Sequence, residues 1–398
     1  MTSKEFDSLL LRELRKNVPN MNGFNTTQTF EYFESVMPPE EVVKFRRVLL
    51  TGCGDSYCAG LAAKPVFENI ESFKGTGQKP GIPTEAHRNI EFSRYYNTYR
   101  GWDYNGPNAY RTLLCAISVS GGPVRPREAL LRMKEKGGGA VAFTNNPNSL
   151  MAQAADWVVN YNMTPSEGPV PNVRSYQASV FLLMMFALYM SVCKGIMTRE
   201  EAEKQRTACM AYINAFSGSK MAEIEEKAFQ LSQDWEERGI ENMDFVADGP
   251  DYSTSFFGSA KMVESFGGLT THDDSEDWLH INFFIRKPEK VGTFIIANES
   301  SKAFSRELET IKVMLHIGRP LAIITDAEDL SVFPEGATIF QLPKSKVRWA
   351  NPLMQHIPMD YVAAFTGLLR KASPYRREDG THPDVKPHRF IDSKLVIV

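Results

Sequence analysis

The stretch Val48-Leu-Leu-Thr-Gly-Cys-Gly-Asp-Ser-Tyr57 decides the fold, because an apolar run breaks into a Gly-x-Gly turn that opens a helix. The plan recurs in Leu113-Leu-Cys-Ala-Ile-Ser-Val-Ser-Gly-Gly-Pro123. Such a strand–turn–helix unit leaves backbone N–H groups at the positive end of a helix dipole, which suits a phosphate. One glycine turn is ordinary loop punctuation, but two that are rich in serine predict a site for a phosphorylated small molecule. The predicted binding residues there are Gly54, Ser56, Ser118, Ser120 and Gly121.

The bulk composition is that of a soluble globular protein of two domains. The chain has 398 residues, of which 42% are hydrophobic and 23% charged, and its net charge of -3 favours neither nucleic acid nor an anionic membrane as partner. The start, Met1 to Asp7, lacks an apolar segment, and the five cysteines form no Cys-x-x-Cys pair. We therefore expect a cytoplasmic protein with reduced thiols. The apolar run from Ala178 to Cys193 predicts a buried core helix, not a membrane span.

Short apolar runs alternate with helical patterns along most of the chain, which predicts an α/β fold with parallel sheets. The expected strands of the first half are 48–51, 112–117, 140–144 and 157–160, and its helices are 55–69, 124–136, a short one after 148, and 175–194. In the second half we expect strands 244–247, 293–297, 321–325 and 338–341, with helices 253–266, 301–317 and 352–371. An opening helix is expected over 4–16.

The two halves resemble each other, which predicts a duplicated, doubly wound α/β domain. Asp55 is followed by Glu68 after thirteen residues, and Asp251 by Glu264 after the same interval. The predicted organisation is a helical extension (1–40), a first domain (41–197), a charged helical connector (198–240), a second domain (241–372) and a tail (373–398).

Lys261, Glu264 and His280 form the candidate catalytic group. The first two are three residues apart on one helix, so they share a face. A carboxylate near the end of a cleft-lining helix meets dipole and desolvation effects that raise its pKa toward the range of a general base. His280 is a candidate proton carrier. Two alternatives stay open: a solvated acidic surface loop, and a metal site formed with His272, which lacks the i, i+4 histidine spacing.

These motifs, together with the long helix opened by Val173-Arg-Ser-Tyr176, resemble the sugar isomerase (SIS) domain. The resemblance covers roughly residues 40 to 398, so the chain is similar to tandem SIS proteins. Its counterparts are the fructosamine-6-phosphate deglycases and the isomerase half of glucosamine-6-phosphate synthase. In that family a Lys-x-x-Glu is followed sixteen residues later by a His, a spacing that Lys261-Met-Val-Glu264 and His280 keep. The segment Arg389 to Lys394 resembles the terminal segment whose lysine closes over the sugar.

The resemblance implies roles for these residues. Ser56, Ser118 and Ser120 would hold a phosphate, Glu264 would move a proton between C1 and C2, and Lys394 would come from the tail. His280 would open the sugar ring, either in its own site or in a neighbouring subunit's, and a homodimer or larger homo-oligomer is implied. Further substrate-binding residues are Ser175 and Lys261. No cofactor and no metal are implied.

The chain also departs from the family's pattern. Ser118-Val-Ser-Gly-Gly-Pro123 lacks the amide and the threonine hydroxyl of Ser-Gln-Ser-Gly-Glu-Thr, and the lysine that follows the serine of the long helix is Gln177 here. Asp55 replaces a threonine; it could cap the helix, yet it would repel a dianion. These changes put the affinity or pose of the phosphate in question.

Three versions of phosphosugar chemistry are open: ketose–aldose isomerisation, deamination of an amino-sugar phosphate, and deglycation of a fructosamine 6-phosphate. We favour deglycation, because the chain is expected to have no glutaminase domain and its tail resembles that group. The non-enzymatic alternative is a sugar-phosphate-binding regulator. No basic face or recognition helix indicates DNA binding.

Overall fold

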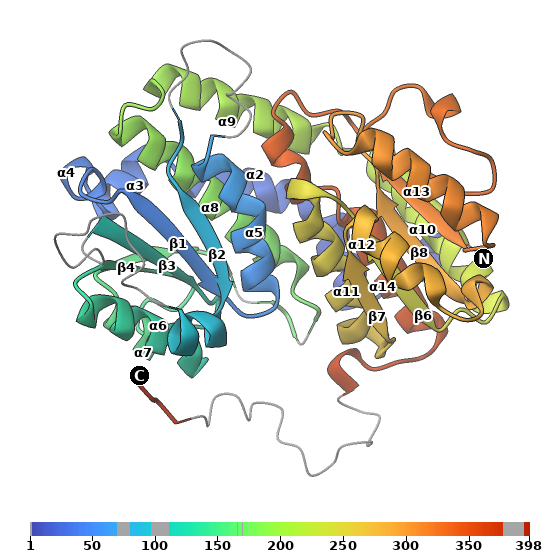
Figure 1. The fold of residues 1–398 in the computed structure, drawn as a ribbon, viewed down its shortest axis with the longest axis horizontal. Coiled ribbons are helices and arrows are strands. Elements are labelled where there is room, and N and C mark those ends of the chain that lie inside the picture. The colour runs from blue at the N-terminus through green and yellow to red at the C-terminus, as the bar shows by residue number, and fades with distance from the viewer. Residues whose placement is uncertain (1, 70–79, 97–110, 165, 169, 377–393) are drawn as a thin grey trace. The chain divides into compact units, whose positions relative to one another are not determined.

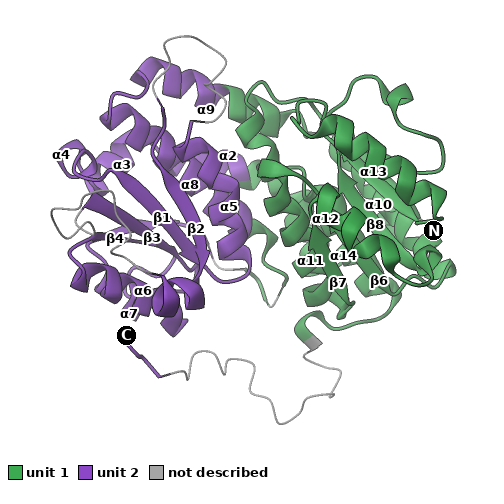
Figure 2. Cartoon of the chain, in the orientation of Figure 1, with its two compact units in different colours: residues 1–20, 166–174, 208–382 green, residues 21–165, 175–207, 383–398 purple. Residues whose placement is uncertain are grey.

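The computed structural model describes residues 2–69, 80–96, 111–164, 166–168, 170–376 and 394–398 (Figure 1). The chain forms two compact units, each described here by itself (Figure 2). Unit 1 comprises Met1–Asn20, Ser166–Arg174 and Ala208–His382, and unit 2 comprises Met21–Pro165, Ser175–Thr207 and Pro383–Val398. The division falls inside both the N-terminal extension and the connector expected from the sequence, whose boundaries stay a prediction.

Unit 2 contains a sheet of five parallel strands in the order β2-β1-β3-β4-β5. Every residue of β1, β3 and β4 is buried, as expected for central strands covered on both faces. The pairing of Leu49 with Leu114 sets the register of β1 against β3. The strands are β1 (Arg47–Gly52), β2 (Thr84–Arg88), β3 (Thr112–Ile117), β4 (Gly139–Thr144) and β5 (Trp157–Asn160).

The helices that follow the strands cover this sheet, with α5 packed on β1 and β2, and α6 on β3 and β4. The helix α8 is long and apolar enough to cross a membrane by length and composition, but 89% of its most apolar window is buried inside the structure. Its predicted burial is therefore confirmed. The helices of this half are α2 (Asn17–Thr27), α3 (Phe30–Val36), α4 (Pro39–Val42), α5 (Asp55–Phe67), α6 (Val124–Glu135), α7 (Leu150–Ala154), α8 (Val173–Cys193) and α9 (Arg199–Asn214).

Unit 1 repeats the same strand order, β7-β6-β8-β9-β10, again with all pairs parallel. Its strands are β6 (Asn242–Val246), β7 (Thr270–Asp273), β8 (Val291–Ile296), β9 (Leu321–Thr325) and β10 (Thr338–Gln341). Its helices are α1 (Leu9–Arg15), α10 (Ser219–Glu237), α11 (Tyr252–Phe266), α12 (Ser275–His280), α13 (Phe304–His316) and α14 (Ile357–Leu369). The predicted duplicated α/β fold with two parallel sheets is confirmed.

Three features differ from the sequence-based expectation. The edge strands β2 and β7 were not predicted, because their residues are polar and only partly buried. The expected helix 4–16 is two pieces, a 3-10 turn at Ser3–Glu5 and α1, since Ser8 caps α1 by accepting from the Leu11 N–H at 3.2 Å. The expected helix 352–371 begins only at Ile357, after a 3-10 stretch over Arg348–Leu353.

Candidate functional site

Unit 2 carries most of its predicted binding residues where the strand order of its sheet reverses. From β1 the chain passes through α5 to β2 on one side, and β3 then lies on the other side of β1. In parallel α/β sheets, ligands bind outside the carboxyl ends of the two strands at such a point. We call the residues that follow β1 and β3 there, 52–56 and 118–122, the switch-point edge of unit 2. The structure brings Gly54, Ser56, Ser118, Ser120 and Gly121 together at this edge.

Glycine is required at this edge by the backbone. Gly54 is the N-cap of α5 with φ of 51°, and Gly121 has φ of 63°, both in the left-handed region. A Cβ at Gly121 would lie 2.2 Å from the Ser149 hydroxyl oxygen, and one at Gly52 would lie 2.6 Å from the backbone of Ser56. The turns are therefore tight, with each helix starting directly behind its turn.

The three serines differ in exposure. Ser118 is buried, Ser56 is half-buried and Ser120 is exposed, with its hydroxyl accepting from the Gly122 N–H at 3.3 Å. Pro123 is the N-cap of α6 and has no N–H to donate. Asp55 is the first residue of α5 and not its cap, since Gly54 takes the cap position without a side-chain bond. The suggested capping role of Asp55 is therefore wrong, and its charge lies in the first turn.

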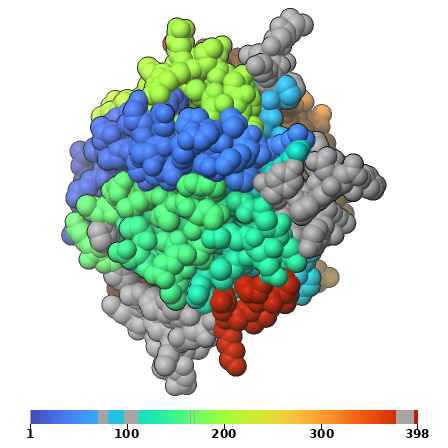
Figure 3. All heavy atoms as spheres, turned by 90° about the vertical axis from the view of Figure 1, so that its left-hand side faces the viewer, coloured from blue at the N-terminus to red at the C-terminus, as the bar shows by residue number. Residues whose placement is uncertain are grey.

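The other residues predicted in unit 2 lie on α8 and in the tail. Ser175 is buried in the first turn of α8, and its carbonyl accepts from the Ser179 hydroxyl at 2.8 Å. Lys394 is exposed, and its carbonyl accepts from Arg125 Nη2 at 2.6 Å. In Figure 3 the C-terminal segment, in red, lies against the teal surface that includes α6. The rest of the predicted tail segment, 389–393, lies outside the described residues.

In unit 1, Lys261 and Glu264 share one face of α11, as predicted. Lys261 Nζ lies 2.5 Å from Glu264 Oε2, with the lysine side chain fully buried and the glutamate 27% exposed. The ammonium also lies 4.8 Å from the ring centroid of Phe257. Lys261 and Glu264 therefore form an ion pair whose lysine side is withdrawn from water.

Tyr375 is a residue of this group that the sequence analysis did not find. Its hydroxyl donates to the Val170 carbonyl at 2.9 Å, lies 3.5 Å from Glu264 Oε2 and is 3.4 Å from Asn172 Nδ2. Tyr375 has φ of 58°, an uncommon conformation for a bulky residue. It follows α14 and meets α11 only through the fold, so no local sequence pattern indicates it.

His280 lies apart from this group. Its ring is 70% exposed at the end of α12, and Nε2 is 3.2 Å from Glu276. His272, on β7, stacks on Phe256 with ring centroids 4.0 Å apart. Within the described part of the chain, no group of three or more His, Cys, Asp or Glu side chains is arranged to hold a metal.

The corresponding switch point of unit 1 is filled by its own side chains. Asn298, after β8, donates to Asp251, after β6, at 3.1 Å. Gln355 donates to both Asp251 and Thr254, at 3.1 and 2.7 Å. Arg348 approaches the same carboxylate at 3.6 Å. These buried bonds tie the two loops together where unit 2 presents serines and glycines.

Burial dominates the electrostatics around this network. It raises the pKa of Asp251, against the lowering effect of Arg348 and of the amide hydrogen bonds. It raises the pKa of Glu307 to about 9, although Ser301 donates to this carboxyl at 2.8 Å. Glu307 is thus protonated at neutral pH, as expected for a carboxyl that is deeply buried.

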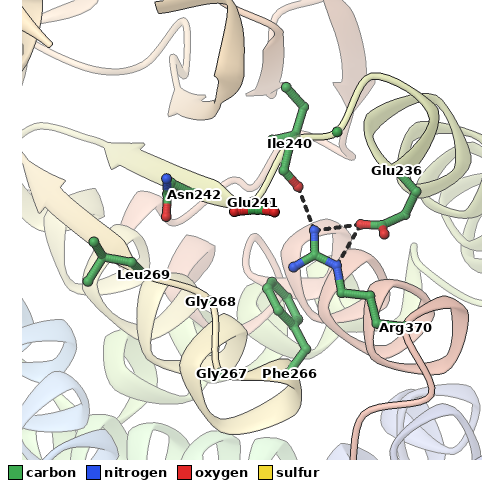
Figure 4. Close-up of a pocket in the computed structure, with 10 residues that line it drawn as sticks. Glu236, Ile240, Glu241, Asn242, Phe266, Gly267, Gly268, Leu269 and Arg370 are labelled. Carbon is green, nitrogen blue, oxygen red and sulfur yellow. Dashed lines mark hydrogen bonds and ion pairs between the residues drawn. The ribbon is translucent and has the colours of Figure 1, made fainter. Parts of the chain in front are cut away.

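A pocket of about 450 Å³ lies at the amino end of β6 in unit 1 (Figure 4). Arg370 enters it, pairs with Glu236 at 2.6 Å, donates to the Ile240 carbonyl and lies 4.6 Å from the Phe266 ring centroid. The pocket is at the opposite end of the strands from the switch point, and none of the predicted site residues lines it. Its lining residues are Glu236, Gly239, Ile240, Glu241, Asn242, Phe266, Gly267, Gly268, Leu269 and Arg370.

The chain is similar to several known proteins in sequence and in fold. No protein-family model matches the chain. The glutamine–fructose-6-phosphate aminotransferase [isomerizing] of Clostridium tetani is 23% identical over 338 residues, which cover 83% of this chain and 50% of that protein. The chain thus spans about half the length of the curated relatives it matches.

Two solved structures show the same fold. The C-terminal domain of glucosamine-fructose-6-phosphate aminotransferase from Francisella tularensis superposes with a TM-score of 0.74 at 16% identity, covering 94% of this chain and 99% of that one. Glucosamine-6-phosphate deaminase from Thermotoga maritima gives 0.64 at 16% identity, covering 96% and 98%.

Proposed function

We propose that this chain, a tandem sugar isomerase (SIS) domain protein related to the isomerase domain of the aminotransferases and to phosphosugar isomerases, moves a proton between C1 and C2 of a 6-phosphosugar. The observation that carries the proposal is the switch-point edge of unit 2, where two helices start behind tight turns that present serine hydroxyls. Phosphate is the ligand that such helix starts favour. In unit 1 the matching position is occupied by Asp251 and Asn298, which are hydrogen-bonded to each other. We therefore expect one phosphate site per chain.

In this proposal Glu264 is the base. Its carboxylate takes a proton from C1 and returns it at C2, one group reaching both adjacent carbons. Lys261 pairs with this carboxylate, and the Tyr375 hydroxyl lies 3.5 Å from the same oxygen. His280 would assist ring opening, and its exposure is compatible with action in a partner's site. A homodimer is part of the proposal, and light scattering at assay concentration checks it.

The substrate that we favour is a fructosamine 6-phosphate. Proton removal at C1 gives an enolamine, and protonation at C2 gives an imine at C1. Water then hydrolyses the imine to an aldose phosphate and a free amine. Ketose–aldose isomerisation uses the same proton transfer without the hydrolysis, and deamination of an amino-sugar phosphate ends in ammonia.

A substrate panel separates these reactions. Fructose 6-phosphate, glucosamine 6-phosphate and several fructosamine 6-phosphates are incubated with the protein and with Glu264→Gln, and products are identified by mass spectrometry. Deglycation predicts an aldose phosphate and an amine from the fructosamines only, formed ~10²–10⁴-fold more slowly by Glu264→Gln. Isomerised fructose 6-phosphate as the main product would overturn the choice of substrate.

A non-catalytic sugar-phosphate sensor is the second candidate. Asp55, Val119 and Pro123 favour it, because they supply fewer donors to a phosphate than the family's loop does. Tight binding of phosphosugars by calorimetry, with no product from any member of the panel, would establish the sensor and refute catalysis.

A further inference from the structure

Arg88, the last residue of β2, lies beside the turn that opens α5. In the parallel pairing of β1 with β2, Arg88 is the partner of Gly52. Neighbouring strands are about 4.8 Å apart, so the Arg88 backbone runs next to the start of the switch-point edge. Figure 1 shows β2 next to β1, with α5 packed near both.

The Arg88 side chain extends toward the first turn of α5. Its guanidinium carbon lies 5.5 Å from the ring centroid of Tyr57, the residue that follows Ser56. Burial raises the pKa of the Tyr57 hydroxyl, and the positive charge of Arg88 works against that rise. Both observations place the charge of Arg88 beside the side chain of Tyr57, which follows Ser56 in the first turn of α5.

The switch-point edge needs such a cation. Its serines are neutral, Pro123 donates nothing and Asp55 adds a negative charge in the first turn of α5. A phosphate monoester carries nearly two negative charges at neutral pH. An arginine offers a planar fork of donors that binds two phosphate oxygens at once.

We propose that Arg88 binds the phosphate of the substrate at the switch-point edge of unit 2 and offsets the charge of Asp55. This inference rests on the proposed function, because it assumes a phosphorylated ligand at that edge. It assigns the recognition of the dianion to a residue on the edge strand β2, outside both serine-bearing loops.

The test measures binding of inorganic phosphate and of fructose 6-phosphate by calorimetry, in the wild type, Arg88→Met and Arg88→Lys. The matched control is Arg46→Met, which removes an exposed arginine just before β1, at the opposite end of the same sheet. We expect Arg88→Met to weaken both ligands about tenfold, as for loss of a charge-assisted hydrogen bond. Arg88→Lys should recover part of the affinity, and Arg46→Met should change nothing.

The outcomes distinguish this inference from the proposed function. If Arg88→Met keeps wild-type affinity while Ser118→Ala with Ser120→Ala loses it, Arg88 is not a ligand but the phosphate site stands. If Arg46→Met loses as much affinity as Arg88→Met, the net charge of the protein explains the loss and the inference is overturned. If the wild type binds neither ligand, both the inference and the proposed function fail. Unchanged melting temperatures exclude misfolding as the cause.

Discussion

Replacing Glu264 by glutamine is expected to lower both the turnover and the stability of the protein. Lys261 is fully buried, 2.5 Å from the Glu264 carboxylate, so Glu264→Gln leaves a buried ammonium without this counter-charge. Removing one partner of a buried ion pair costs about 3–5 kcal/mol. We expect the lower end, about 3 kcal/mol, because Glu264 is itself 27% exposed and water reaches the pair. Turnover should fall by ~10²–10⁴-fold, the usual share of general base catalysis.

The double variant Lys261→Met with Glu264→Gln separates the two effects. It removes the buried ammonium together with its partner and should return the free energy of unfolding in urea to within about 1 kcal/mol of the wild type. Turnover should stay as low as in Glu264→Gln. Phosphosugar binding by calorimetry should stay nearly intact in Glu264→Gln, whereas the double variant, which also lacks the predicted binding residue Lys261, should bind more weakly. Recovery of turnover in the double variant would show that the loss was structural. Full turnover in Glu264→Gln would refute the catalytic role outright.

Three further predictions concern other groups. Ser118→Ala with Ser120→Ala should weaken phosphosugar binding by about 1.5–3 kcal/mol for each hydroxyl that bonds the dianion, and unchanged affinity in calorimetry would contradict the assignment. Tyr375→Phe removes a hydroxyl 3.5 Å from Glu264 Oε2 and should lower turnover while leaving phosphosugar binding unchanged; unchanged turnover argues for a purely structural tyrosine. Burial raises the pKa of Glu307 from 4.5 to about 9, so the folded chain keeps this proton at pH values where the unfolded chain has lost it. The free energy of unfolding should therefore fall as the pH rises between these two values. Urea unfolding should show that the free energy of unfolding falls less between pH 5 and pH 8 in Glu307→Gln than in the wild type. An equal fall in both proteins would contradict the burial effect.

The central strands and their turns could be predicted from the sequence because they are encoded locally. The spans of the central strands β3 and β9 agree with the expected ranges residue for residue, since buried parallel strands are short continuous apolar runs, and those of the edge strands β5 and β10 agree as well. The edge strand β2 reads Thr-Glu-Ala-His-Arg and carries no such pattern. Missing it also hid Arg88, whose position beside Gly52 depends on strand pairing.

The candidate site was predictable only in part, for the same reason. Lys261 and Glu264 pair within one helix, so their spacing was enough to place them together. Tyr375 lies 111 residues from Glu264 along the chain and meets it only after folding. His280 keeps the spacing of the resembled family but lies on a different helix, and spacing alone could not fix where its ring would be.

The bonds between Asp251, Asn298 and Gln355 have a consequence for how the two halves of this chain can change over evolution. Two units of the same topology can have different roles, and in unit 1 the residues at the switch point stabilise the fold by hydrogen bonds to one another. Substitutions there should be selected against through the abundance of folded protein, whereas those at the matching serines of unit 2 should be selected against through ligand affinity. In a deep mutational scan that scores expression and binding separately, substitutions at the switch point of unit 1 should lower expression, and substitutions at the serines of unit 2 should lower binding.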